Sequence, residues 1–199
     1  MQAETLASAY RLWRRNWGGK GREYTAGALV WQVTIPAAFY LAFNDRNVYV
    51  KINDCWPVTS WAVVDYFLRP KPAFYTVARE LRPFTVGMTR KEKKTFVDDR
   101  SAANFTIETI LEIWGTNSTL SDKEVTLEVT SFDLESDWTD KWNKKVNLNA
   151  NASTELFSGK LPGQPDRKKA SDLPRVIIVS ARLLDGQTVL GRYSNWWVI

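Results

Sequence analysis

The sequence predicts an α+β composite, in which a short α/β segment precedes an antiparallel β-sandwich of immunoglobulin-like type. Residues 23–32 are interpreted as a strand buried on both faces, because Ala28-Leu29-Val30-Trp31 within them lack polar alternation. Helical patterns lie on either side of this stretch. From Phe84 onward the period changes to two, which indicates half-buried strands. The boundary between the two parts is therefore expected near Arg82 and Pro83.

The helical patterns of the first part have clear ends. Residues 2–18 carry apolar side chains at steps of three and four, and two glycines end the run. A second helical pattern is broken at Pro70 and Pro72, resumes over residues 73–81 and ends at Pro83. One strand with two helices cannot cover a parallel sheet on both faces, so this part is expected to be a piece of a larger α/β unit.

The second part contains several strand patterns separated by turn signals. Polar and apolar residues alternate, or apolar residues cluster, in four segments: residues 104–113, 124–129, 146–149 and 175–179. The turn signals are Thr116-Asn117-Ser118, Leu161-Pro162-Gly163 and Asp185-Gly186. About seven strands in a segment of this length predict a sandwich.

Composition excludes several kinds of chemistry. The chain has one Cys and no His, so it can form no intramolecular disulfide, no histidine-based catalytic triad and no histidine-ligated metal site. No metal and no cofactor are expected. The net charge is +5, and the two basic runs, residues 90–94 and 167–169, are interpreted as solvated loops, so no nucleic-acid partner is expected.

One stretch raises the question of a membrane. Residues 24–43 contain no charged side chain and are just long enough to cross a bilayer. Gln32 and Pro36 interrupt the run, which favours a buried soluble segment. No membrane association is expected, although a membrane-anchored sandwich remains an alternative.

Four motifs in the first half carry a family resemblance. They are YTAGALVWQ at residues 24–32, NDCWPVTSW at 53–61, AVVDYFLRPKPAFY at 62–75 and ARELRPFTVGMTR at 78–90. In these residues the chain resembles the fungal β-mannosidases of glycoside hydrolase family 2, clade B. The resemblance implies that residues 1–83 are the tail of a catalytic (β/α)8 barrel. It also implies that residues 84–199 are an Ig-like β-sandwich, truncated at its C-terminal end.

The resemblance also implies an activity. Its members are exo-acting, retaining enzymes that remove terminal β-D-mannose from manno-oligosaccharides and mannans, using two carboxylates about 5–5.5 Å apart. Both catalytic Glu residues of the family lie on earlier barrel strands, so this chain is expected to contain no catalytic residue and to be inactive alone. A non-catalytic sandwich that binds carbohydrate or protein is the alternative.

The residues after the last barrel strand are the candidate substrate-binding site. Asn53 and Asp54 could hold sugar hydroxyl groups, and Trp56 could cover the apolar face of a sugar ring, because catalytic groups of such barrels gather at this end of the strands. The competing interpretation is that the two polar residues cap the loop and that Trp56 packs against the barrel. Manno-oligosaccharide is the expected partner.

One segment departs from the family pattern. Residues 33–51 separate the strand from Asn53, where the family has a single aliphatic residue. A valine codon begins with GT and a lysine codon can end in AG, so the coding sequence of the segment can have the ends of an intron. We therefore interpret residues 33–51 as a translated intron. The resemblance favours a cytoplasmic location, or secretion if a signal peptide precedes the first residue.

The remaining acidic and aromatic residues are given structural roles. Acidic side chains outside the site are expected at the surface: Glu4, Glu23, Glu80, Glu108, Glu112, Glu124 and Glu128. Tryptophans outside the site are expected to be packing residues: Trp13, Trp17, Trp31, Trp61, Trp114 and Trp196.

Overall fold

The computed structural model describes residues 1–18, 25, 27–28, 57, 59–98, 101–169 and 171–195, with side chains omitted at 97–98 and 101–103. The chain divides into two compact units. The first comprises residues 1–14 and 25–82, and the second comprises residues 15–24 and 83–199. Neither described helix has the length and apolar character needed to cross a membrane.

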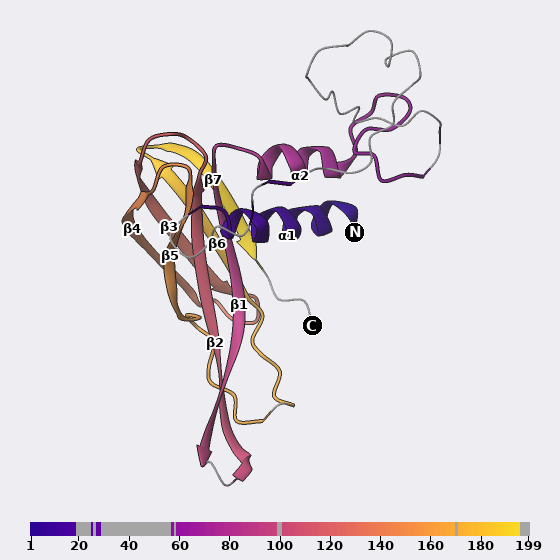
Figure 1. Ribbon diagram of the computed structural model, residues 1–199. Coiled ribbons are helices and arrows are strands. Elements are labelled where there is room, and N and C mark those ends of the chain that lie inside the picture. Colours follow the sequence, from indigo (N-terminus) through magenta and orange to yellow (C-terminus); the bar gives the residue numbers. More distant parts are fainter. Residues whose placement is uncertain are drawn as a thin grey trace. The chain divides into compact units, whose positions relative to one another are not determined.

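The first unit contains two helices, α1 (Gln2–Arg15) and α2 (Pro72–Glu80) (Figure 1). Pro72 begins α2, where its fixed φ suits the first helical turn and its missing N–H is not needed. The helix ends at Leu81, whose backbone N–H donates to the carbonyl oxygen of Val77 at 2.9 Å. A helix is therefore present in residues 2–15 and in the part of the second pattern that follows Pro70.

The segment before α2 is a turn, where the sequence predicted helix. Val64 and Pro70 form an isolated antiparallel bridge, and Leu68 between them has a φ of 62°. The carboxylate of Asp65 accepts a hydrogen bond from the backbone N–H of Arg69 at 2.9 Å. An aspartate that bonds a nearby backbone group in this way offers the chain an alternative to helix, which explains the error.

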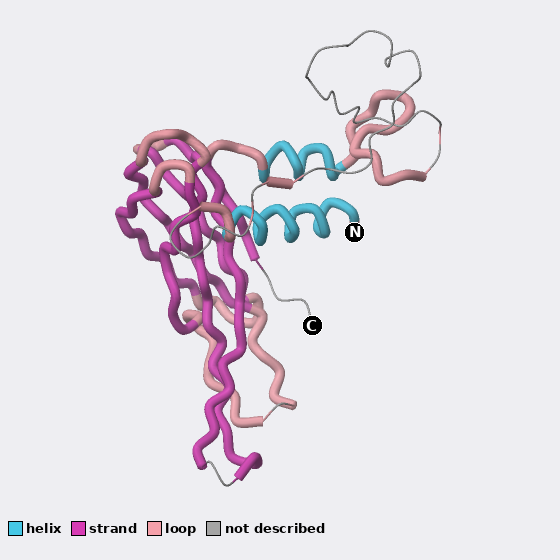
Figure 2. Tube along the Cα trace, in the orientation of Figure 1, coloured by secondary structure: helices cyan, strands magenta, loops and turns pink. Residues whose placement is uncertain are grey.

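The second unit is a sandwich of two antiparallel sheets (Figure 2). One sheet has the order β1-β2-β5 and the other β4-β3-β6-β7. Their strands are β1 (Phe84–Asp98), β2 (Ser101–Asn117), β3 (Lys123–Asp133), β4 (Thr139–Leu148), β5 (Ala152–Lys160), β6 (Ile177–Asp185) and β7 (Thr188–Asn195). The antiparallel sandwich predicted from the alternation is confirmed.

The core of the sandwich lies between the two sheets. Every second residue of β3 points inward, and Leu127 and Val129 are fully buried. The other buried members of this core are Val86, Met88, Leu111, Ile113, Val125, Leu148, Leu156, Leu161, Ile177, Val179, Ala181 and Leu183. Such a continuous apolar interior is the main source of stability of the unit.

The hairpin of β1 and β2 continues beyond the other strands (Figure 1). Its register runs from the pair Phe84–Asn117 to the pair Asp98–Ser101. The basic run 90–94 lies inside β1, so its interpretation as a loop was wrong. Charged side chains are common on an exposed edge strand, where they discourage pairing with another chain, and this made the strand hard to see in the sequence.

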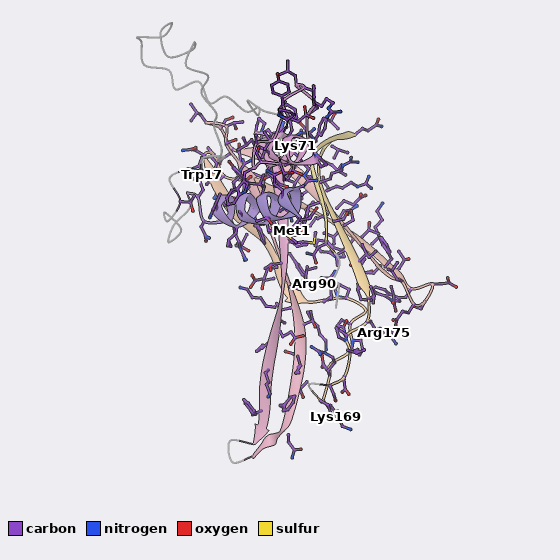
Figure 3. All side chains as sticks on the ribbon, turned by 90° about the vertical axis from the view of Figure 1, so that its right-hand side faces the viewer. Met1, Trp17, Lys71, Arg90, Lys169 and Arg175 are labelled. Carbon is purple, nitrogen blue, oxygen red and sulfur yellow. The ribbon has the colours of Figure 1, made fainter. Side chains whose placement is uncertain are left out.

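The second basic run lies in the connection between β5 and β6. Arg167 is only 8% exposed, and its backbone exchanges hydrogen bonds with Ile107 of β2 at 2.8 and 3.1 Å. Its guanidinium also contacts the carboxylate of Glu92 on β1. Lys169 lies beside the projecting part of the hairpin (Figure 3). Arg167 is therefore a buried structural residue, where a solvated position was predicted.

Candidate functional site

The predicted substrate-binding residues fall outside the described part of the chain. Asn53, Asp54 and Trp56 are among the residues without a described position, as are residues 33–51. The same holds for most of the apolar stretch 24–43. Their proposed roles in sugar binding, as a translated intron and as a strand therefore stay predictions.

The most developed polar site of the described residues lies on the outer face of the β1-β2-β5 sheet. We call it the Arg15 cluster, and it comprises Arg15, Lys91, Glu112, Trp114 and Glu155. The Arg15 Nη2 lies 2.8 Å from a Glu112 oxygen and 3.0 Å from a Glu155 oxygen, and its Nε donates to Glu155 at 2.7 Å. Lys91 Nζ donates to the second oxygen of Glu112 at 3.0 Å. One guanidinium thus holds two carboxylates together.

Strand geometry positions the cluster. Glu112 and Trp114 are two residues apart on β2 and so share one face, and Glu155 on β5 is the register partner of Trp114. Lys91 lies on the neighbouring strand β1, one step diagonally from Glu112. The cluster therefore spans all three strands of the sheet.

A glycine opposite Trp114 makes room for the indole. Gly87 is the register partner of Trp114 on β1, and a Cβ added at Gly87 would lie 2.5 Å from the ring. The Arg15 guanidinium lies over the indole, 4.4 Å from the ring centroid, and Trp114 is only 4% exposed. Trp114 is thus a packing residue.

The residues after Arg15 continue along the same sheet. The backbone N–H of Ser153 on β5 donates to the carbonyl oxygen of Trp17 at 3.0 Å. Gly18 adopts a φ of 59°, and a Cβ there would lie 2.6 Å from the carbonyl oxygen of Asn151. Residues 15–18 are therefore anchored on β5, both by the Arg15 cluster and by their own backbone.

Comparison with known proteins identifies the second half of the chain. Residues 109–198 match the family described as "Mannosidase Ig/CBM-like domain". The whole chain is similar to Beta-mannosidase B of Thermothelomyces thermophilus, with 40% identity over 200 residues, covering 98% of this chain and 21% of the relative. Beta-mannosidase B of Aspergillus flavus is 34% identical over 203 residues, covering 98% and 20%. The chain is related to the fungal β-mannosidases. It spans about a fifth of the length of these relatives.

Solved structures agree with this relation at the level of the fold. A β-D-mannosidase from Dictyoglomus thermophilum matches with a TM-score of 0.63 at 20% identity, covering 98% of this chain and 18% of that one. An exo-chitosanase from Amycolatopsis orientalis matches with a TM-score of 0.52 at 14% identity, again over 98% and 18%. Both likenesses concern the fold alone.

The carboxylates of the Arg15 cluster do not have the properties of a β-mannosidase acid–base pair. A retaining glycosidase needs one carboxyl group whose raised pKa keeps it protonated. Burial by itself would raise the pKa of Glu112, but hydrogen bonds and charges from Lys91 and Arg15 outweigh it and lower that pKa. Two cations balance the two carboxylates, so the cluster holds the sheet and residues 15–18 together.

A second buried carboxylate of the β-mannosidase-like sandwich lies on the other sheet. Glu128 on β3 is 9% exposed and accepts hydrogen bonds from Lys141 Nζ and Arg182, the latter at 2.7 Å. The hydrogen bond from Lys141 lowers its pKa, burial opposes this, and Arg182 lowers it further. Glu128 occupies an outward-facing position of β3, as the alternation predicted, and Lys141 and Arg182 on the neighbouring strands cover it there.

Two further expectations of the sequence are corrected in the first unit. Glu80 is 4% exposed and forms a buried ion pair with Arg11, whose Nε lies 3.3 Å from its oxygen, so Glu80 is no surface residue. Trp61 is 71% exposed and Trp13 is 40% exposed, so neither is a buried packing residue. Glu4 is exposed, as predicted.

No metal site accompanies these charges in the part of the chain that the structure describes. Within it, no three His, Cys, Asp or Glu side chains gather as a metal ion would require. Arg90 is a further partly buried cation, and its guanidinium donates to the carbonyl oxygens of Ile177, at 2.6 Å, and Asn195, at 2.9 Å. Burial lowers the pKa of Arg90 to about 10, although the charge of Tyr193 opposes the shift.

Proposed function

We propose that this chain is part of an exo-β-mannosidase, which hydrolyses terminal β-D-mannose from the non-reducing ends of manno-oligosaccharides and mannans. The observation that carries the proposal is the 40% identity to a fungal β-mannosidase over 98% of the chain. By the resemblance, the complete enzyme uses a retaining mechanism with two carboxylates, an acid–base and a nucleophile. The chain supplies the Ig-like sandwich and the tail of the catalytic barrel.

The chain by itself is proposed to be inactive. Three described carboxyl groups have a displaced pKa, those of Asp65, Glu112 and Glu128, and each is lowered in the presence of cationic neighbours. A carboxyl group of this kind stays ionised at neutral pH and cannot donate a proton to a leaving group. The lowered pKa values of these three carboxyl groups thus favour structural roles for them over a role as the catalytic acid.

Asn53, Asp54 and Trp56 are proposed to contact the sugar in the complete enzyme. An amide and a carboxylate would hydrogen-bond sugar hydroxyl groups, and an indole would stack on the ring. Removing a hydrogen-bonding partner of a bound substrate leaves a polar group unpaired, which costs on the order of 1–3 kcal/mol. In the complete enzyme, Asp54→Ala should therefore lower kcat/KM by about ten-fold or more.

Hydrolysis of an aryl β-mannoside tests the proposal. The isolated chain and the product of the complete gene are assayed side by side, together with Asp54→Ala and Trp56→Ala variants of the complete product. We expect activity only from the complete product, and a lower kcat/KM for both variants. Activity of the isolated chain, or a complete product that hydrolyses other glycosides but not β-mannosides, would contradict the proposal.

The translated intron at residues 33–51 is a separate proposal. It is supported by the departure from the family pattern and by the codons that Val33 and Lys51 can use. Sequencing of the mature transcript tests it. We expect a mature message in which the codon of Gln32 is followed directly by that of Ile52. A mature message that keeps the codons of residues 33–51, together with a stable protein that contains them, would refute the idea.

A further inference from the structure

The chain carries three copies of the tripeptide that accepts an N-linked glycan, Asn-X-Ser/Thr. They begin at Asn104, Asn117 and Asn151. Such a tripeptide is expected at the surface of a secreted protein, because the glycan is bulky and hydrophilic. Two of the three asparagines meet this expectation, since Asn104 and Asn151 are exposed. Asn117 does not, because it is fully buried.

The side-chain amide of Asn117 uses its full hydrogen-bonding capacity inside the sandwich. Its nitrogen donates two hydrogen bonds, one to the carbonyl oxygen of Ser121 at 2.8 Å and one to that of Leu148 at 3.1 Å. Its oxygen accepts from the backbone N–H of Thr119 at 2.9 Å and from the Thr119 hydroxyl at 2.7 Å. Asn117 thereby ties the end of β2 to the loop that follows it and to the end of β4.

Glycosylation acts on the same nitrogen. The oligosaccharide comes from a lipid diphosphate. The bond between the sugar C1 and the diphosphate oxygen breaks, and the lipid diphosphate leaves with the electron pair. A bond forms between C1 and Asn117 Nδ2, and the nitrogen gives one proton to a basic group of the transferase. The product has one N–H hydrogen where the fold uses two.

The glycosylated side chain does not fit the folded sandwich. Asn117 is 0% exposed, so no path to solvent is open for a glycan on its nitrogen. Loss of one N–H hydrogen also leaves the carbonyl oxygen of Ser121 or Leu148 without its donor, and an unpaired buried polar group is costly. The end of β2 therefore has to leave the sandwich if Asn117 carries a glycan.

The order of synthesis decides whether the glycan arrives before the fold protects Asn117. N-linked oligosaccharide is transferred to a nascent chain as it enters the secretory pathway. The side-chain amide of Asn117 meets Leu148, which lies 31 residues later in the sequence. The β5 residue that pairs with Asn117 is Ala152, which comes later still. The tripeptide is therefore open when the transferase meets it and closed once the sandwich is complete.

The other two tripeptides provide an internal comparison. Asn104 lies on β2, one residue before Phe105, which pairs with Phe96 of β1. Asn151 lies in the turn between β4 and β5 with a φ of 49°, a conformation that asparagine tolerates better than most residues. Both are exposed, so a glycan on either side chain leaves the core between the two sheets intact.

We propose that Asn117 is an acceptor of N-linked oligosaccharide whose modification prevents the sandwich from folding. Modification of Asn104 or Asn151 leaves the sandwich able to fold. The chain therefore matures only where nascent chains escape N-glycosylation, and a route through the secretory pathway leaves it misfolded because of Asn117.

Expression in a eukaryotic host, with and without a cleavable signal peptide, tests the proposal. Thr119→Ala destroys the tripeptide at Asn117 but also removes one hydrogen bond to the Asn117 oxygen, so the variant should be slightly less stable. With the signal peptide, we expect Thr119→Ala to raise the yield of soluble product several-fold. Without the signal peptide, the same variant should give no more soluble product than the unchanged chain. A gain confined to the secretory route cannot come from stability.

Two variants are the matched controls. Thr106→Ala removes the tripeptide at Asn104. Ser153→Ala removes the one at Asn151 and replaces a hydroxyl that is buried without a hydrogen-bond partner among the described residues. Neither should change the soluble yield on the secretory route, and each should lose only its own glycan. Occupancy is measured by mass spectrometry of peptides after enzymatic release of the glycans in heavy-oxygen water, and glycosylated Asn117 should be found in the insoluble fraction alone.

Three results would overturn the proposal. Asn117 is no acceptor if its peptide carries no glycan in either the soluble or the insoluble fraction. The fold tolerates the glycan if occupied Asn117 is found in soluble protein with the circular dichroism of the chain made without a signal peptide. Glycosylation of Asn117 is not the cause of misfolding if Thr119→Ala fails to raise the soluble yield, or if the two controls raise it equally.

Discussion

The two units solve the problem of apolar burial in opposite ways. The sandwich encloses Leu111, Leu127 and Leu183 completely between its sheets. Among its described residues the first unit encloses mainly alanine, and its helices meet through the buried ion pair between Arg11 and Glu80. Both units contain secondary structure of the expected type. The presence of helices or strands therefore does not by itself show that a unit folds stably on its own. Enclosed apolar area is the property that distinguishes the two.

The buried ion pair of the first unit does not replace an apolar core. Taking two charges out of water costs free energy that their mutual attraction offsets only partly. A buried ion pair is therefore weak evidence that a unit is stable. Arg79 also contacts Glu80, at 2.9 Å, which keeps the buried carboxylate balanced. We therefore expect the first unit to be the less stable part of the chain.

The largest loss of unfolding free energy should come from a substitution in the core of the sandwich. Leu127→Ala removes a side chain that is fully buried on β3. The lost burial and the remaining cavity should cost about 2–5 kcal/mol of unfolding free energy. Urea unfolding followed by far-ultraviolet circular dichroism measures it, with Leu173→Ala as the exposed control. A cost for Leu127→Ala no greater than that of the control would refute the assigned core.

The Arg15 cluster should give the next largest effect. Arg15→Met leaves Glu112 and Glu155 without the guanidinium they share, and the loss should be on the order of 1–3 kcal/mol. Arg192→Met on β7 is the control, because Arg192 is exposed and the described residues form no ion pair with it. The control should stay within about 0.5 kcal/mol. Equal effects of the two substitutions would show that the cluster does not hold residues 15–18.

The sequence predicted the sandwich far better than its polar clusters. Residues 104–113 and 124–129 alternate clearly, and they lie in β2 and β3. The middle of strand β1 was hidden by its basic run, because the five consecutive charged residues 90–94 carry no apolar alternation. Arg15 and Glu155 are 140 residues apart, so no local spacing could announce their contact. Tertiary pairing of this kind is visible only once the strands are in register.

The candidate substrate-binding site was predicted from the sequence, but the described residues do not include it. Asn53, Asp54 and Trp56 were selected by family resemblance, and their roles still await a test. Sequence alone also placed Trp61 in the interior, because tryptophan is usually packed. Its exposure in the structure belongs to the same pattern as that of Phe67 and Tyr75. These exposed positions were missed because nothing in the sequence distinguishes an apolar residue of a core from an exposed one.

Acid should weaken the polar clusters of the sandwich. The folded-state pKa values of Glu112 and Glu128 are lowered, so their stabilising contribution is present above the unfolded glutamate pKa of about 4.3 and is lost as the pH falls through the folded values. Glu112→Gln should therefore lower stability at neutral pH and flatten its decline in acid. Unfolding free energies measured from pH 7 to pH 3 test this, and an unchanged slope would contradict it.

The smallest effect should come from an exposed side chain of α2. Tyr75→Ser changes a side chain that is 62% exposed, so the unfolding free energy should shift by no more than about 0.5 kcal/mol. Thermal and urea unfolding of the isolated chain measure this. A large loss would mean that Tyr75 already packs within its own unit.

Hydrogen exchange of the complete chain, followed by mass spectrometry, tests the contrast between the units most directly. Amides that open only on global unfolding exchange slowest, and those of a weakly packed unit exchange sooner. We predict slow exchange in β2, β3 and β6, and exchange in α2 that is faster by orders of magnitude. Equal protection of α2 and β3 in the chain alone would contradict the account.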